Sequence, residues 1–389
     1  MTHKDPAHAP TVCTPGQPSL KGISEYFLYL GGTSFGGTVV IAEKIRKQLV
    51  EEKAWIGEEE YSQGFAFAQL APGPLVPQLV MYLGYLRRGI VGATVAALSF
   101  IAPSFLIVLL LAYIYVRSNG LAWIQAVFYG IGAAVVVIIA QAAYKLCRAA
   151  VKNNRAAWII VIAVAVLSAT THQQVIWMFL GGGIVFLAFN NFSKSGTLRS
   201  FVSVEVFPLI GISLGKSLDL LVFFTKAGLF VFGSGFAVIP LLHNGVVLEH
   251  HWLSENQFID AVAIGMITPG PMVVVAAFIG FLVSGISGAI AATIGVFLPI
   301  YVFVVVFAPH YKAVSSNLQV RAFLRGVTAA AAGAIVGTVY ILGRKSIHDW
   351  PTTLIAIVTV GLMVLPKKIP EPLIIAGAGV AGLVLYRFH

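Results

Sequence analysis

The sequence predicts an all-α polytopic membrane protein made of two tandem helical repeats of inverted topology. Each repeat is expected to contain about five membrane crossings and one re-entrant Pro-Gly-Pro hairpin. Three observations lead to this prediction: a strongly apolar composition, charge-free runs long enough to cross a bilayer, and self-similarity between the two halves of the chain.

The composition excludes an ordinary water-soluble domain. Of the 389 residues, 58% are hydrophobic and 10% are charged, and the mean hydropathy is +0.89. A soluble domain is typically about 25% charged. The runs 89–116 and 121–144 contain no charged residue, and a spanning helix needs about 20 apolar residues. The net charge of +10 lies in short clusters between apolar runs, as the positive-inside rule expects, so topology accounts for most of it and no nucleic-acid partner is predicted.

The two halves of the chain match in a constant register. Phe35-Gly36 matches Phe232-Gly233, Trp55 matches Trp252, and Pro72-Gly73-Pro74 matches Pro269-Gly270-Pro271, each 197 positions later. After the loss of one residue, Pro103, Gly130 and Tyr144 match Pro299, Gly326 and Tyr340, each 196 positions later. We therefore expect a disordered tail over 1–22, a first repeat over 23–200 and a second over 201–389.

Each repeat has the same order of segments. A glycine-broken apolar segment is followed by a polar amphipathic stretch, an apolar segment interrupted by Pro-Gly-Pro, and four further apolar segments. The first repeat has these at 24–41, 42–60, 61–86, 89–116, 121–144, 156–169 and 174–190. The second has them at 219–241, 242–257, 258–283, 286–308, 320–342, 351–365 and 371–386. The last two segments of each repeat are short, and we expect them to pack as a tilted pair.

Loop charge predicts that the repeats are inverted. The first linker carries Lys44, Arg46, Lys47 and Lys53, whereas its counterpart at 243–257 has no Lys or Arg. Arg87-Arg88 likewise corresponds to the uncharged Ser284-Gly285. Positive loops face the cytoplasm, so the two linkers are expected on opposite sides of the membrane. Both flanks of each Pro-Gly-Pro segment then share a side, which makes that segment a re-entrant hairpin. Arg344-Lys345 fits this scheme poorly.

The breaks in the apolar segments are the candidate site. Inverted repeats typically bind cargo near the membrane midplane, where broken helices of the two halves meet. Proline removes backbone donors, glycine allows close approach, and a helix N-terminus attracts an anion. The alternative is that these residues only permit close packing or a kink. Recurrence in both halves favours a binding site, for which the candidates are Thr33, Ser34, Gly36, Gly37, Gln69, Pro72, Gly73, Pro74, Gln78, Gly233, Ser234, Gly235, Thr268, Pro269, Gly270 and Pro271.

A few charged residues are further candidates. Lys226 lies in the apolar run 220–236 and is interpreted either as an anion-attracting residue or as a snorkelling side chain. Glu43 and Asp260 flank the hairpins and are candidates for proton coupling, with an ordinary boundary carboxylate as the alternative. His243, His250 and His251 lack a metal-ligand pattern and are expected to be solvated. No nucleophile elbow, Walker loop or dinucleotide fingerprint occurs, so neither an enzyme nor a cofactor is expected.

Taken together, these motifs resemble the chromate ion transporter family over nearly all of the chain after the tail. In the first half the resemblance rests on residues 32–37, Arg46, Trp55, residues 69–74 and Gln78, and in the second on residues 232–235, Pro240, 252–253, Asp260, 268–271 and 297–299. Thr38 and Met266 depart from the pattern, because the family often has proline and glutamine at these places.

The resemblance implies a secondary transporter in the cytoplasmic membrane that exports chromate by alternating access and so gives chromate resistance. Apart from the resemblance, Glu43, Arg46 and Asp260 are candidates for gating or coupling. Sulfate is the closest chemical look-alike, so a transporter of sulfate or another small anion is one alternative. A passive anion channel is another, and a homodimer is an open alternative to a monomer.

Overall fold

The computed structural model describes residues 18–35, 37–118, 121–151, 155–171, 175–192, 215–233, 235–310, 318–365 and 369–386. These residues are helical apart from turns and two strands of two residues each, so the predicted all-α class is confirmed. Four described stretches are long and apolar enough to cross a bilayer, namely Leu75–Ser118, Trp123–Val151, Met272–Phe307 and Gln319–Ser346.

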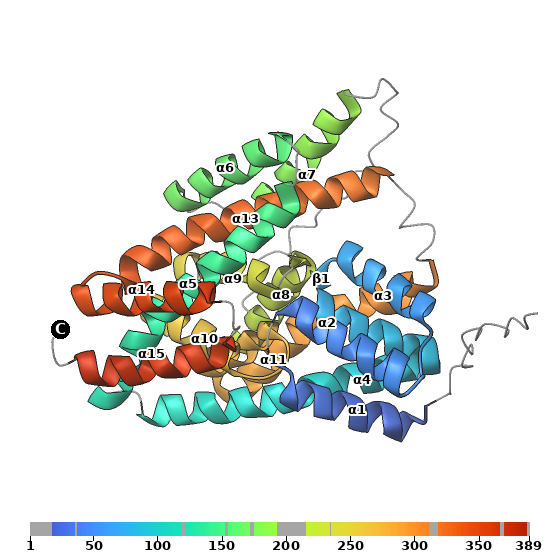
Figure 1. Ribbon diagram of the computed structural model, residues 1–389, viewed down its shortest axis with the longest axis horizontal. Helices are drawn as coiled ribbons and strands as arrows, with labels where there is room; N and C mark the ends of the chain where they lie inside the picture. The colour runs from blue at the N-terminus through green and yellow to red at the C-terminus, as the bar shows by residue number, and fades with distance from the viewer. Residues whose placement is uncertain are drawn as a thin grey trace, which may run out of the picture.

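The elements follow the predicted order in both halves (Figure 1). The first half contains α1 (Leu20–Thr33), α2 (Thr38–Arg46), the π-helix η1 (Lys47–Glu52), α3 (Glu58–Leu70), β1 (Gly73–Pro74), α4 (Leu75–Ser118), α5 (Ala122–Val151), α6 (Arg155–Thr170) and α7 (Val175–Phe192). The second contains α8 (Lys216–Leu229), β2 (Phe232–Gly233), η2 (Gly235–Ala237), α9 (Val238–Leu242), the π-helix η3 (His243–Glu249), α10 (Glu255–Ile267), η4 (Met272–Val274), α11 (Val275–Phe307), η5 (Ala308–His310), α13 (Leu318–Ser346), α14 (Trp350–Val364) and α15 (Glu371–Leu385).

Helix α1 begins within the range that the sequence assigns to the tail. The Ser19 side chain accepts a hydrogen bond from the Gly22 amide at 3.1 Å and caps the helix. A serine at this position satisfies one of the amides that a helix start leaves unpaired. The ordered chain therefore starts before residue 23, and the rest of the expected tail, 1–17, lies outside the described residues.

Helices α4 and α11 each fold back on themselves. Arg88 and Gly89 have non-helical dihedrals, with φ of 58° at Gly89, and Ser284 and Gly285 repeat the same pair with φ of 62° at Gly285. A side chain added at Gly84 would collide with the Gly92 backbone. In a straight helix these two residues would lie about 12 Å apart, so the chain must reverse direction between them. Each element is thus an antiparallel pair of limbs joined by a tight glycine turn.

The first limb of α4 forms a helical hairpin with α3, and Pro72-Gly73-Pro74 lies at its tip. Phe67 stacks on Tyr82 with ring centroids 5.2 Å apart. At the open end, Glu60 of α3 forms an ion pair with Arg87 of α4. The ion pair joins the two flanks of the segment, so both flanks lie at the same end of the hairpin.

The second limbs of α4 and α11 pack against the opening helices of their own halves and against each other. A side chain on Gly31 of α1 would collide with the Phe100 carbonyl of α4, and one on Gly228 of α8 would collide with the Val296 carbonyl of α11. Between the halves, Thr94 Oγ1 lies 2.7 Å from Tyr301 Oη. Small residues at these contacts let the helix backbones approach closely.

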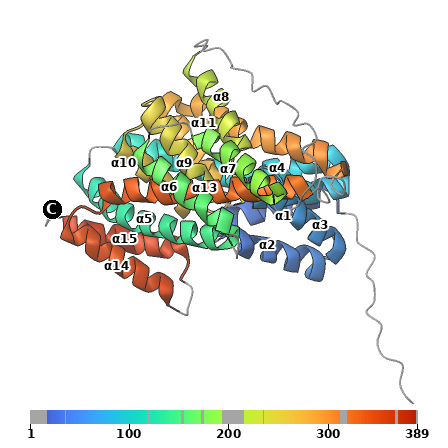
Figure 2. The ribbon, with the colours of Figure 1, turned by 90° about the horizontal axis from the view of Figure 1, so that it is seen from above.

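The last helices of each half are exchanged between the halves. Gly182 of α7 packs against Gly326 of α13, and Gly130 of α5 packs against Gly382 of α15. Figure 1 shows α6 and α7 along α13, and Figure 2 shows α14 and α15 along α5. The expected tilted pairs therefore pack mainly on the long helix of the opposite half, which ties the two repeats into one body.

The long helices α5 and α13 run in opposite directions along the longest axis of the molecule. In Figure 1 the colour changes from teal to green toward the right along α5 and from orange to red toward the left along α13. Figure 2 shows the same opposition after the quarter turn. The repeat matches α5 with α13, so this one corresponding pair runs in opposite directions.

Candidate functional site

The two Pro-Gly-Pro tips are each hydrogen-bonded to the helix break of the opposite half. The Gly73 amide donates to the Val231 carbonyl at 2.5 Å, and the Gly270 amide donates to the Ser34 carbonyl at 2.8 Å. These are corresponding pairs, since Gly270 and Val231 each lie 197 positions after their counterparts, Gly73 and Ser34. The same backbone hydrogen bond between the halves therefore occurs twice, once at each Pro-Gly-Pro tip.

The first of these connections extends into a short parallel ladder. Gly73 pairs with Phe232, and Pro74 pairs with Gly233. Gly73 has a φ of 130° and Gly270 one of 95°, a region that only glycine adopts easily. Proline lacks an amide hydrogen, so the glycine supplies the only backbone donor in each Pro-Gly-Pro. That donor is used within the protein, so neither glycine amide is free to bind a ligand.

The surroundings of the two tips differ in polarity. A side chain on Gly73 would meet Gln78 Nε2 and Ile300 Cγ1, whereas one on Gly270 would meet Ser104 Oγ and the Gly31 carbonyl. Ser104 and Ile300 occupy corresponding positions, one residue after Pro103 and Pro299. Sequence reasoning missed both, although their place directly after the matched prolines was an available signal.

Two side-chain oxygens beside the tips are buried without a hydrogen-bond partner among the described residues. They are Ser34 Oγ and Gln78 Oε1, and their side chains are 3% and 0% exposed. The Gln78 amide nitrogen donates to the Pro72 carbonyl at 2.5 Å. Buried polar atoms are nearly always paired, so these two are exceptions, and their part in binding a ligand stays a prediction.

The structure brings most of the predicted residues together at the tips. Ser34, Gly73, Gln78 and Gly270 are joined directly by the hydrogen bonds above or lie beside them. The other predicted residues that belong to the tips and breaks are Pro72, Pro74, Gly233, Gly235, Thr268, Pro269 and Pro271. Thr268 is buried and donates to the Ile264 carbonyl at 2.7 Å. Gly36 and Ser234 lie outside the described residues.

Four predicted residues are exposed at the surface of the described chain. Gln69, Gly37 and Thr33 are exposed, and the Thr33 hydroxyl donates to the Tyr29 carbonyl at 2.6 Å. Lys226, in the last turn of α8, is also exposed. Its exposure agrees with the snorkelling interpretation, and its role in attracting anions stays a prediction.

The coupling candidates occupy different environments. Glu43 is exposed and accepts from Arg46 Nε at 3.1 Å. Asp260 of α10 is partly buried and accepts from the Tyr115 hydroxyl of α4 at 2.7 Å. Within the described residues Asp260 forms no ion pair, and burying a lone carboxylate is costly. Glu43 thus lies in a surface ion pair, whereas Asp260 is held by one described hydrogen bond from a tyrosine, and a role of either in proton coupling stays a prediction.

The linkers before the two hairpins contain corresponding contacts between a basic and an acidic residue. Arg46 donates to Glu58 at 3.0 Å, and His243 Nε2 lies 2.9 Å from Glu255 Oε2. The expectation that His243 is solvated is wrong, because it is 2% exposed. Its hydrogen bond to Glu255 lowers the pKa of that carboxyl against the opposing effect of burial. His250 stacks on Trp252, and no metal-binding group of His, Cys, Asp or Glu occurs in the described ranges.

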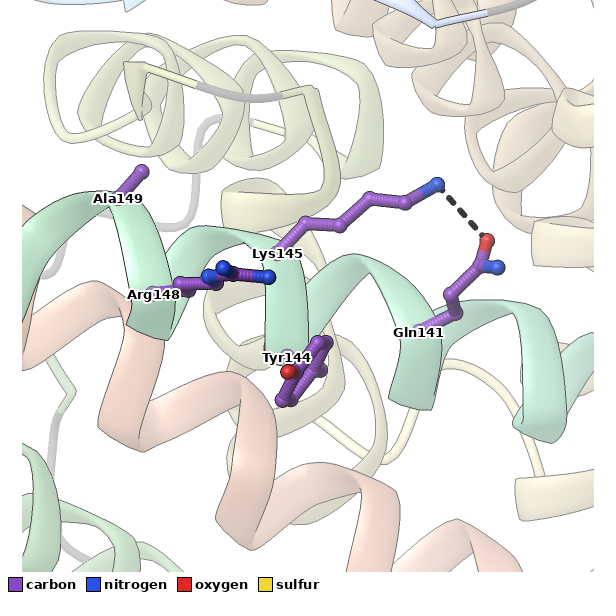
Figure 3. Close-up of a pocket in the computed structure, with 5 residues that line it drawn as sticks. All are labelled: Gln141, Tyr144, Lys145, Arg148 and Ala149. Carbon is purple, nitrogen blue, oxygen red and sulfur yellow. Dashed lines mark hydrogen bonds between the residues drawn. The ribbon is translucent and has the colours of Figure 1, made fainter. Parts of the chain in front are cut away.

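An open hollow of about 470 Å³ lies on α5, away from the tips. Figure 3 shows its lining of Gln141, Tyr144, Lys145, Arg148 and Ala149, with Lys145 donating to Gln141 at 2.9 Å. All five residues come from one face of a single helix, so the hollow does not enclose a ligand. Its two cations, Lys145 and Arg148, lie within the last turns of α5.

Comparison with known proteins identifies the duplicated unit. The chromate transporter family model matches residues 22–187 and again 218–383, which confirms the predicted repeat. The boundaries at residues 200 and 201 stay a prediction. No solved structure matches the chain.

Three relatives are similar over nearly the whole length. A chromate transport protein of Cupriavidus metallidurans is 46% identical over 389 residues, which cover 98% of this chain and 97% of the relative. A probable chromate transport protein of Synechococcus elongatus is 44% identical over 377 residues, covering 95% and 96%. A chromate transport protein of Pseudomonas aeruginosa is 29% identical over 401 residues, covering 97% and 95%. The chain is thus a multi-pass membrane protein and not an enzyme, and it belongs to the chromate transporter family.

Proposed function

We propose that this chain exports chromate across the cytoplasmic membrane by alternating access. Two relatives that match this chain over nearly their whole length are named chromate transport protein and probable chromate transport protein. The reciprocal bonds from Gly73 to Val231 and from Gly270 to Ser34 carry the mechanistic part of the proposal. Each bond joins one half to the other, so a rearrangement of the helix breaks during alternating access would change both tips together.

We further propose that the repeats are inverted and that each Pro-Gly-Pro hairpin is re-entrant. Support comes from the opposite directions of α5 and α13 and from the loss of positive charge between corresponding linkers. The ion pair between Glu60 and Arg87 also places both flanks of the first hairpin at one end. Backbone that leaves the helix at membrane depth must be buried in protein or line water, as these tips do.

The membrane potential supplies a driving force for this direction of transport. A potential that is negative inside drives each exported negative charge with about 2.3 kcal/mol per 100 mV. Exchange of a proton at Asp260, which Tyr115 holds by one hydrogen bond, would couple the proton gradient to the same cycle. The site therefore needs no ATP.

The test is the flux of labelled chromate into inverted vesicles from cells that produce the chain, with and without an energised membrane. We expect saturable uptake that depends on energisation and that preloaded chromate accelerates by exchange. Uptake no greater than in vesicles lacking the chain, with the protein verified in the membrane, would overturn the proposal. Strong inhibition by excess sulfate would favour a broader anion site, and flux that neither saturates nor exchanges would favour a channel.

A further inference from the structure

Lys44 of α2 holds its ammonium group at the end of α1, beside the first helix break. Its Nζ donates to Thr33 Oγ1 at 3.4 Å and lies 5.2 Å from the centre of the Tyr29 ring. Thr33 is the residue directly before Ser34, whose carbonyl accepts the Gly270 amide at the second tip. The ammonium therefore lies close to one of the two hydrogen bonds that connect the halves.

The end of α1 lies beside the middle of a helix limb that can cross the bilayer. The second limb of α4 covers residues 90–118, which exceeds the roughly 20 residues that a crossing needs. Near the middle of this limb, Ser104 Oγ donates at 3.4 Å to the carbonyl of Gly31, two residues before Thr33. The Lys44 ammonium therefore lies at the depth of the middle of this limb, where an ionisable group is a functional candidate by default.

The charge of Lys44 is not compensated by an acidic residue of the described chain. Its contacts are a hydroxyl and an aromatic ring, whereas the neighbouring cation Arg46 pairs with three carboxylates, those of Glu43, Glu51 and Glu58. An ammonium has three hydrogens to donate, and Thr33 accepts one of them. Because Lys44 is partly exposed, an anion in water can reach its remaining donors.

The second half also has a lysine just before its break, but on a different helix. Lys226 of α8 lies 197 positions after Tyr29, whose ring faces the Lys44 ammonium in the first half. The position that corresponds to Lys44 is Leu241, which is buried. A lysine that recurs by its place beside the break, and not by register, is expected if each break needs a positive charge.

On the basis of the proposed function, we propose that Lys44 binds the oxyanion as it enters the site at the first break. Chromate is a doubly charged tetrahedral anion whose oxygens all accept hydrogen bonds. The Lys44 ammonium donates to one of these oxygens, while Thr33 and Tyr29 hold the lysine side chain in place. A lysine ammonium is a compact, strongly hydrated point charge, so it attracts the anion without enclosing it and can release it to the break.

The experiment is equilibrium binding of labelled chromate to the purified full-length protein in lipid nanodiscs, at a fixed low ionic strength. Lys44→Gln should weaken binding by about tenfold, because it removes a hydrogen bond from a charged donor. Lys44→Arg, which keeps the charge, should restore most of the affinity. Lys53→Gln is the matched control, because Lys53 belongs to the same linker and lies 5.1 Å from the centre of the Trp55 ring, but no described contact joins it to the break. Its affinity should equal that of the parent.

A second measurement needs no variant, so the inference stays testable if Lys44→Gln fails to fold. An amine-acylating reagent is added to the parent protein in nanodiscs, and mass spectrometry measures the rate of acylation at Lys44 and at Lys53. An ammonium that is bound to an anion is covered and keeps its proton, so it reacts more slowly. Chromate should therefore slow acylation of Lys44 and leave acylation of Lys53 unchanged.

Three outcomes would overturn the inference: a Lys44→Gln protein with parental affinity, an equal loss of affinity in Lys53→Gln, or acylation of Lys44 that bound chromate does not slow. Each would make Lys44 an ordinary boundary cation of the linker. A parent protein that binds no chromate would instead contradict the proposed function.

Discussion

The linkers of the two halves share a backbone and differ in charge. Each contains a π-helix and then a non-glycine residue at positive φ, which is Ala54 in the first linker and His251 in the second. Each ends with a matched backbone hydrogen bond, donated by the Trp55 amide to the Leu49 carbonyl and by the Trp252 amide to the Val246 carbonyl. The first linker is held by the guanidinium of Arg46, and the second by the imidazole of His243. The fold of the repeat was thus retained while its chemistry diverged.

Arg46 and His243 also differ in how many acidic partners they have. Arg46 also bonds Glu43 and Glu51, at 3.1 and 2.8 Å, and lies at a partly exposed surface. Buried His243 packs its ring against Phe258, with centroids 5.3 Å apart, and has one described carboxylate partner. Surface ion pairs contribute little each, so the first linker is held by several weak bonds and the second by one enclosed bond.

The largest expected effect comes from filling the tips. Gly73→Val and Gly270→Val should each abolish chromate uptake, because a β-branched residue at these φ values is strained by about 1–3 kcal/mol and has no space. Gly270→Val should also lower the amount of folded protein, since its side chain would approach the Gly31 carbonyl, within 3.1 Å of the added carbon. At Gly73 the nearest atoms belong to side chains, which can move.

Uptake in vesicles and the melting temperature in detergent measure these effects. Gly361→Val is the control, because the space around Gly361 is open and its φ is not positive. Full uptake by the Gly73 variant would show that the first tip is not the site, and equal loss of folded protein in both variants would remove the asymmetry between the tips.

The next effect concerns a carboxyl that only the second half has. Asp260 corresponds to Gln63, which bonds Glu59 at 3.1 Å on the same helix. Asp260→Asn should reduce the flux driven by a pH gradient by about tenfold or more, because the amide cannot exchange a proton, and should leave chromate binding intact. Tyr115→Phe should reduce the flux less, because it keeps the carboxyl.

Flux with an imposed pH gradient, compared with flux under a potential alone, measures this coupling. Gln63→Met serves as the control on the first half. An Asp260→Asn protein that responds to the gradient like the parent would return Asp260 to the interpretation of an ordinary boundary carboxylate.

Much of the fold could be predicted from the sequence, because its signals are local. Charge-free runs, Pro-Gly-Pro and the register between halves predicted the segments and their breaks. Burial of His243 was not predicted, since a polar linker resembles a solvated one. The repeat contained the missing signal, because Arg46 and Glu58 correspond to His243 and Glu255.

Contacts between distant segments were beyond local reasoning. The exchange of α6 and α7 with α14 and α15 depends on which glycine surfaces meet, as at Gly182 and Gly326, and the repeat register is compatible with either arrangement. For the same reason, the sequence did not predict that Gly73 and Gly270 donate to carbonyls of the opposite half.

A smaller effect distinguishes the two linkers by pH. His243 lowers the folded-state pKa of Glu255, so the stabilisation is present above the ordinary glutamate value of 4.5 and is lost as pH falls through the lowered pKa. His243→Gln should therefore lower the melting temperature above that pH and converge with the parent in acid. Lys345, which also lowers this pKa, remains in both proteins. Arg46→Gln is the matched variant in the first linker. If the melting temperatures of both variants converged with that of the parent in acid, the two linkers would not differ in their pH dependence.

The smallest effect is expected at the start of α14. Asp349 caps this helix by accepting from the Thr352 amide at 2.9 Å and also accepts from the Tyr129 hydroxyl of α5 at 2.5 Å. Burial raises the pKa of Asp349, but hydrogen bonds from Thr352 and Tyr129 outweigh it and bring the pKa to about 2. The stabilisation is thus complete above the ordinary value of 3.8 and declines as pH falls toward 2. Asp349→Ala should cost about 1 kcal/mol, as loss of a cap does, and leave uptake unchanged. A melting temperature equal to the parent's would show that the contact between α5 and α14 stabilises the exchanged helices without this cap.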